Sequence, residues 1–160
     1  MTRRRASTSD LLAAAGAVLL VVAVLPRCSG RGPPPVRASW TLTPGVANPQ
    51  VTQQTVAETI CVRGWTRTIR PPTSYTDALK VRQLRQYGLR GSPRAYQEDH
   101  LISLELGGDP TDPRNLWPEP RSRAEEVDKV ENDLNAKICD GSLSLREAQQ
   151  RISQIKHGQG

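Results

Sequence analysis

The stretch that decides the fold is residues 96–119, which read YQEDHLISLELGGDPTDPRNLWPE. An adjacent carboxylate and imidazole, Asp99-His100, come first. Gly107-Gly108 follows and allows the chain to reverse closely. Asn115-Leu116 comes after a loop that contains two Asp-Pro pairs, which are turn signals. The order acid, imidazole, turn, amide is uncommon, so this stretch is the most informative part of the chain for fold and function.

Two short strands are expected around this loop. Residues 95–98 are predicted to form a strand that leads into the acid and the imidazole, and residues 115–117 are predicted to form a second one. Pro118 and Pro120 are expected to end the second strand, because proline cannot donate a backbone hydrogen bond. Residues 101–113 are expected to be the connecting loop.

Helices are predicted after the second strand. Ser122 and Glu125 form a possible capping box, as do Ser144 and Glu147. The apolar residues that follow each box recur at helical spacing. They are Val127, Val130, Leu134 and Ile138 in the first helix, and Leu145, Ala148, Ile152 and Ile155 in the second.

The residues before the first strand also read as mostly helical. A helix is expected from Asn48-Pro49 to the cysteine at position 61, with Asn as its cap and Pro at its first position. Residues 62–69 alternate loosely and are interpreted as a strand or an extended loop. A further helix is expected to start at Ser74 or Thr76, to present apolar residues on one face and to end at Gly88. Those apolar residues are Ala78, Val81, Leu84 and Leu89. The predicted class is therefore α+β, in a small and mostly helical domain.

The first part of the chain has the composition of a targeting segment. Arginines at positions 3–5 precede an uncharged stretch at 11–25, which is shorter than the roughly 20 residues that span a membrane. We expect residues 1–28 to be a signal peptide or an N-terminal anchor, residues 29–41 a Pro/Gly-rich linker, and residues 42–157 the folded domain. The protein is then exported, as a secreted or envelope-associated monomer that touches membrane only through an uncleaved leader.

Two cysteines, Cys61 and Cys139, lie in the predicted domain. In an oxidising compartment two cysteines most simply pair, so a disulfide is expected. The alternative is a pair of buried free thiols. The other histidine, His157, lies in a Gly-rich tail, and no role is expected for it.

Charge divides the chain into a basic and an acidic half, within a formal net charge of +6. Residues 62–94 carry eight Lys and Arg against a single acid, and residues 98–140 carry twelve acids against five bases. A basic segment suits the phosphates of a nucleic acid. The expected contacts are Arg67, Arg70, Arg82 and Arg85. The alternative is a solvated surface on which the two halves pair with each other.

The motif Asp99-His100, Gly-Gly, Asn115-Leu116 followed by a helix resembles the HNH, or ββα-metal, endonucleases, in particular small exported bacterial members. The resemblance covers about residues 95–138. It implies that Asp99 ligates a divalent metal and that His100 is the general base. It also implies that Asn115 orients His100 or touches the metal shell.

The helix after the second strand has no histidine, although many HNH proteins place a metal ligand there. Asp128 is the first choice for that ligand, and Glu119 is the other candidate. An all-oxygen site of this kind would favour Mg²⁺ or Mn²⁺. The resemblance thus implies metal-dependent hydrolysis of nucleic acid, with DNA expected before RNA. The alternative is a non-catalytic binding protein of the cell envelope on a degenerate scaffold.

Overall fold

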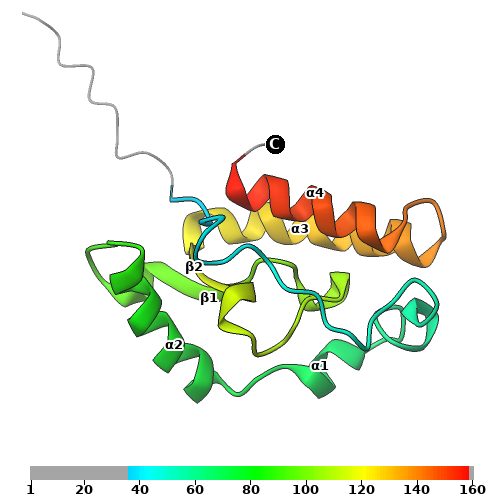
Figure 1. Ribbon diagram of the computed structural model, residues 1–160, viewed down its shortest axis with the longest axis horizontal. Helices are drawn as coiled ribbons and strands as arrows, with labels where there is room; N and C mark the ends of the chain where they lie inside the picture. The colour runs from blue at the N-terminus through cyan, green and yellow to red at the C-terminus, as the bar shows by residue number, and fades with distance from the viewer. Residues whose placement is uncertain (1–35, 159–160) are drawn as a thin grey trace, which may run out of the picture. The chain divides into compact units, whose positions relative to one another are not determined.

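The computed structural model describes residues 36–158. The predictions for residues 1–28 and for the start of the linker lie outside this range. Within it, four α-helices and one two-stranded antiparallel sheet make a small α+β fold (Figure 1). The elements are α1 (Trp65–Ile69), α2 (Thr73–Gln86), β1 (Tyr96–His100), β2 (Leu116–Pro120), α3 (Arg121–Cys139) and α4 (Leu145–His157). None of the described helices has the length and apolar character needed to cross a membrane.

The strands β1 and β2 form the hairpin that the sequence predicts, with Gln97 opposite Glu119 and the last residue of β1 opposite the first of β2. β2 ends at Pro120 as predicted, but Pro118 lies inside the strand, and both prolines pair with residues of β1. A strand with a single neighbour uses the N–H groups of alternate residues only. The two prolines are two positions apart, so both can turn their nitrogens to the free edge.

Helix α3 begins directly after β2 and runs beside α4, while α2 packs against the hairpin (Figure 1). The capping box predicted at Ser122 is not used, since the helix already starts at Arg121 and its first turn has no side-chain cap. The predicted box at Ser144 is confirmed in part: its side chain accepts a hydrogen bond from the backbone N–H of Glu147.

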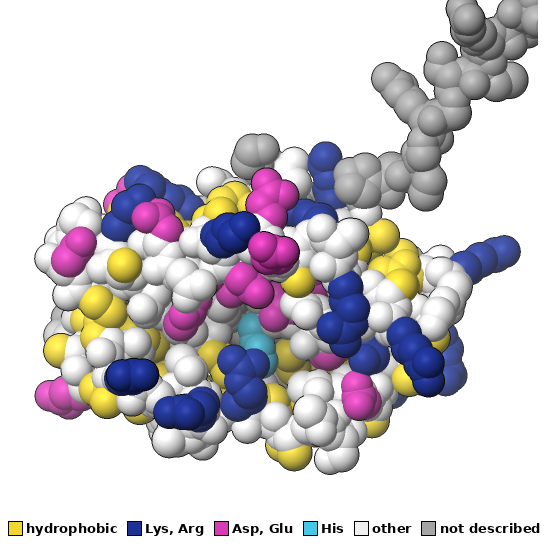
Figure 2. Space-filling view, turned by 180° about the vertical axis from the view of Figure 1, so that it is seen from behind, with side chains coloured by type: hydrophobic (Ala, Val, Ile, Leu, Met, Phe, Trp, Pro, Cys, Tyr) yellow, Lys and Arg dark blue, Asp and Glu magenta, His cyan; other side chains and the backbone are white. Residues whose placement is uncertain are grey.

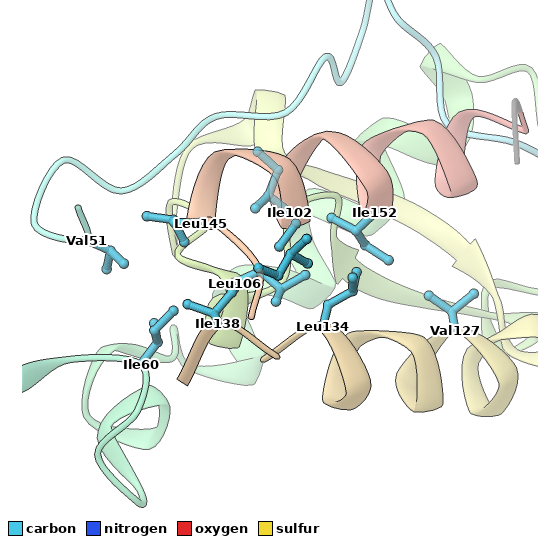
Figure 3. Packing of buried hydrophobic residues seen from close by; sticks show 11 residues of the cluster. Val51, Ile60, Ile102, Leu106, Val127, Leu134, Ile138, Leu145 and Ile152 are labelled. Atoms are coloured by element: carbon cyan, nitrogen blue, oxygen red, sulfur yellow. The ribbon is translucent and has the colours of Figure 1, made fainter. Parts of the chain in front are cut away.

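The main core lies between α3, α4 and the loop that joins the strands (Figure 3). The predicted apolar stripes of both helices supply much of it, with Val130 and Ile155 only partly buried. The buried residues of this core are Val51, Ile60, Ile102, Leu106, Val127, Leu134, Ile138, Leu143, Leu145, Ala148 and Ile152. The stripes therefore predicted correctly which helix faces are buried.

The segment before α1 differs from its prediction. Residues 48–61 form turns with one short 3₁₀ turn, Val56–Glu58, and no α-helix. The hydroxyl of Thr55 donates to the carbonyl of Gln50 and accepts from the N–H of Thr52, so it competes for the backbone groups that a helix would use. Residues 62–69, expected to be extended, contain the helix α1 instead.

A disulfide between Cys61 and Cys139 joins the turn before α1 to the end of α3, with Cα atoms 5.6 Å apart. It closes a long loop, with a sequence separation of 78 residues. The predicted pairing is therefore the one present in the structure. It fixes α1 near α3, which matters because residues after α1 form one wall of the cavity described below.

The predicted helix around Ser74 is confirmed as α2, but the residues predicted for its apolar face are only partly the buried ones. Leu79, Gln83 and Leu84 are its buried residues, whereas Val81 is 42% exposed. The amide of Gln83 donates to the carbonyl of Pro113, and this contact ties α2 to the loop between the strands.

The domain begins earlier than residue 42. Ala38, which the sequence assigned to the linker, packs on Leu101 and Trp117, and its N–H donates to the carbonyl of Lys156. The prediction that His157 lies in a tail outside the packed structure was also wrong. That ring is buried at the end of α4, is hydrogen-bonded to the Ser153 carbonyl and stacks on the ring of Trp40.

Candidate active site

A cavity of about 420 Å³ runs along β1, between the residues that follow α1 and the first half of α3. Figure 2 shows this side of the molecule as a hollow with a histidine at its base, acidic side chains on one side and basic ones on the other. The ionisable residues that line the cavity are Arg70, Glu98, Asp99, His100, Glu105, Asp128 and Glu131. The structure therefore brings Asp99, His100, Asp128 and Arg70, all singled out from the sequence, to one place.

The imidazole of His100 is oriented by the loop between the strands. Its Nε2 lies 3.0 Å from the carbonyl oxygen of Pro110. A carbonyl can only accept, so Nε2 carries the hydrogen and Nδ1 has the free lone pair. Nδ1 has no hydrogen bond within residues 36–158 and is not fully enclosed, so it is open to the cavity.

Burial lowers the pKa of His100 below its ordinary value, against the opposing effect of its hydrogen bond to Pro110. Only 5% of the residue is exposed. The imidazole is therefore neutral near pH 7, with a basic nitrogen open to the cavity. Those are the properties that a general base requires.

Asp99 was expected to ligate a metal, but in the structure its carboxylate is paired with a lysine. Its Oδ2 accepts a hydrogen bond of 2.6 Å from Nζ of Lys156, which is completely buried. Burial acts to raise the pKa of Asp99, but the charge and hydrogen bond of Lys156 prevail and lower it. The carboxylate is thus ionised, with its charge offset by an internal ammonium.

Glu119 does not line the cavity. It is fully buried on β2, where Oε2 accepts a hydrogen bond from the Gln97 amide. Burial raises its pKa to about 7, and the nearby charge of Asp99 adds to the effect. The structure gives no support to a ligand role for Glu119 in this cavity.

Glu98, Glu105 and Asp128 are carboxyl groups of the cavity that have no hydrogen bond or ion pair within residues 36–158. Burial raises the pKa of Glu98 to about 8, so this group is protonated near pH 7, whereas Asp128 is exposed at the mouth. Burial raises the pKa of Glu105, and the charge of Asp128 raises it further. The two carboxyl groups are therefore close enough to influence each other electrostatically.

Across residues 36–158, no three His, Cys, Asp or Glu side chains are arranged as a metal-binding group. Mg²⁺ commonly uses only one or two carboxylates, with water and substrate phosphate completing its shell. The pair Glu105 and Asp128 fits such an open site.

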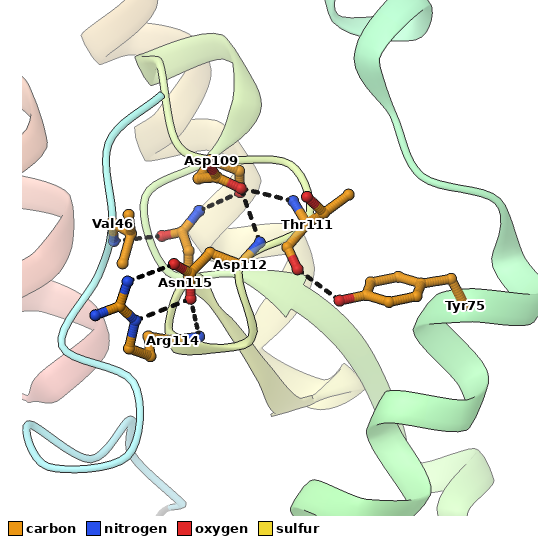
Figure 4. A network of polar contacts seen from close by, with 7 residues as sticks. All are labelled: Val46, Tyr75, Asp109, Thr111, Asp112, Arg114 and Asn115. Carbon is orange, nitrogen blue, oxygen red and sulfur yellow. Dashed lines mark hydrogen bonds and ion pairs between the residues drawn. The ribbon is translucent and has the colours of Figure 1, made fainter. Parts of the chain in front are cut away.

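The side chain of Asn115 hydrogen-bonds to backbone groups, including those of Val46 and Asp109 (Figure 4), and within residues 36–158 no hydrogen bond joins it to the His100 ring. Its Oδ1 accepts from the N–H groups of Ile102 and Val46, and its Nδ2 donates to the carbonyls of Ile102 and Asp109. Asn115 was expected to orient His100 or to touch the metal shell, and any orienting effect in this structure is indirect. It clamps the loop whose next carbonyl, that of Pro110, holds the ring.

The four arginines expected at nucleic acid occupy two regions. Arg70 lines the cavity, and Arg67 is exposed one turn before it. Arg82 and Arg85 lie exposed on α2. Of the four, only Arg70 lines the cavity.

Four ionisable residues of the site were missed from the sequence: Glu98, Glu105, Glu131 and Lys156. Glu131 and Lys156 carried a signal, since they fall on the buried stripes of α3 and α4 at the spacing of their apolar neighbours. A charge on such a stripe implies a buried partner. Glu105 lies in the loop between the strands, where no periodicity could point to it.

Searches for similar proteins gave no family assignment. The chain matched no protein-family model, no curated protein and no solved structure. The case for a function therefore rests on the geometry of this cavity and on the motif that builds it.

Proposed function

We propose that the protein is a metal-dependent nuclease that hydrolyses phosphodiester bonds in the cavity beside β1. The observation that carries the proposal is a neutral, buried His100 whose Nδ1 has no hydrogen bond within residues 36–158, in a cavity that Glu105 and Asp128 also line. The arrangement strand, loop, strand, helix around this histidine also agrees with an HNH-type module.

In this proposal each residue of the cavity has its own role in hydrolysis. Nδ1 of His100 takes a proton from the attacking water, while Nε2 stays on the Pro110 carbonyl. Arg70, at the cavity wall, offsets charge on the scissile phosphate. Glu105 and Asp128 would hold Mg²⁺ or Mn²⁺, which supplies further charge stabilisation on the phosphoryl oxygens. The exposed arginines of α2 would contact flanking phosphates, and DNA is the first substrate to test.

The test is cleavage of plasmid DNA by the full chain in Mg²⁺ or Mn²⁺. His100→Ala is expected to lose about 10²–10⁴-fold in rate, the usual contribution of a general base. Glu105→Gln with Asp128→Asn should raise the metal concentration needed for cutting. Glu147→Gln, an exposed change on α4, is the matched control and should leave the rate unchanged. Equal cutting by wild type and His100→Ala would refute the assignment.

One observation favours the second candidate, a non-catalytic envelope protein that binds a partner. The Lys156 ammonium already neutralises Asp99, the residue that the motif would give to the metal. Titration calorimetry separates the two. A nuclease should bind Mn²⁺ more weakly after Asp128→Asn, whereas a non-catalytic scaffold should show no binding of Mn²⁺ by either protein.

A further inference from the structure

The ammonium of Lys156 lies in a cage of three oxygens. Nζ is 2.6 Å from Asp99 Oδ2, 2.6 Å from the backbone oxygen of His100 and 2.7 Å from Glu131 Oε1. The side chain is completely buried. The oxygens of Asp99 and His100 accept hydrogen bonds from the ammonium, whereas Glu131 is held as an ion pair without hydrogen-bond geometry. Lys156 therefore connects α4 to β1, through Asp99 and His100, and to α3, through Glu131.

The cage holds one ammonium against two acidic side chains, although burial raises the pKa of Glu131 to about 8. One ammonium faces the carboxylates of Asp99 and Glu131, with Glu119 close enough to contribute to the charge around it. Carboxylate and carbonyl oxygens are the ligands that hard divalent cations prefer. The present contacts of 2.6–2.7 Å would have to shorten by only about 0.5 Å to reach Mg²⁺–oxygen distances.

We propose that Lys156 is the resident cation of this cage, that it excludes divalent ions from Asp99 and Glu131, and that it positions His100. A metal is then confined to the side of the cavity that holds Glu105 and Asp128. The positioning of His100 matters for catalysis only if the proposed nuclease function holds. The exclusion of ions from the cage does not depend on it.

The test counts Mn²⁺ ions per chain, by the electron paramagnetic resonance signal of free Mn²⁺, in the full chain with its disulfide intact. Lys156→Gln should bind one ion more than the wild type. Adding Asp99→Asn should remove that extra ion, because the cage loses its charged ligand. Lys156→Arg keeps the cation and should match the wild type. No extra ion in Lys156→Gln, or an extra ion that survives Asp99→Asn, would overturn the proposal.

Lys156→Gln leaves two buried carboxylates uncompensated and can fail to fold in metal-free buffer. In that case Mn²⁺ should restore the far-ultraviolet circular dichroism of the wild type, and a chain that stays unfolded at saturating Mn²⁺ would overturn the proposal. A wild type that binds no Mn²⁺ would count against the metal-dependent nuclease alone. If the nuclease is active, cutting by Lys156→Gln should recover at Mn²⁺ concentrations beyond those that saturate the wild type.

Discussion

Replacement of Asn115 by alanine should destabilise the fold strongly, although the residue contributes no apolar surface. The amide makes four hydrogen bonds to backbone groups of three segments and is completely buried. Each hydrogen bond contributes about 1 kcal/mol net, and buried groups left without partners add to the loss. We therefore expect Asn115→Ala to lower the free energy of unfolding by about 3–5 kcal/mol, a large share of the stability of a small domain.

The assay is urea unfolding of the full chain, with the disulfide oxidised and followed by circular dichroism. Asn132→Ala is the matched control, because that amide makes a single hydrogen bond on the exposed face of α3. It should change stability by less than about 0.5 kcal/mol. A loss below about 1.5 kcal/mol for Asn115→Ala, with an unchanged m value, would show that the four-bond clamp is not what holds the loop.

Asn115→Asp gives a sharper version of the same test. It keeps the acceptor for Ile102 and Val46, but it turns an oxygen toward the carbonyls of Ile102 and Asp109. A buried charge facing two acceptors is costly, so this variant should be at least as unstable as Asn115→Ala. A well-tolerated aspartate would refute the donor role of Nδ2 and, with it, the account of how the loop is held.

Three further predictions concern the disulfide, the basic helix and pH. Loss of the disulfide in Cys61→Ser with Cys139→Ser should lower the free energy of unfolding by about 4.5 kcal/mol, from the entropy of a 78-residue loop, and urea unfolding would measure it. Charge reversal by Arg82→Glu with Arg85→Glu should reduce the slope of log affinity for DNA against log salt by about 1.8, if each arginine contacts one phosphate; an unchanged slope would contradict this role. Burial raises the pKa of Glu98 to about 8, so the folded state holds its proton more tightly than the unfolded state and stability falls as pH rises from about 4.5 to 8. Glu98→Gln should make that fall smaller, because Glu119 and Glu131 with their raised pKa values still contribute to it, and should exceed the wild type in stability at about pH 9, as thermal unfolding at several pH values would show.

The local patterns of the sequence were enough to predict much of the scaffold. The strand that contains Asp99 and His100, its pairing with the strand after Asn115, and the helices that follow were read from turns and from periodicity. These signals are local because a turn needs particular residues at particular positions, and a helix buries every third or fourth side chain. The same logic failed at residues 48–61, where threonine hydroxyls compete for the backbone.

The sequence by itself determined the hairpin, the buried stripes and the histidine at the end of β1. Only the tertiary structure decided what surrounds that histidine. Lys156 reaches Asp99 across 57 positions, and Glu105 meets Asp128 across the cavity, so neither meeting leaves a periodic trace along the chain. Periodicity indicates that a side chain is buried but does not identify its partner, because the partner depends on how separate elements pack together.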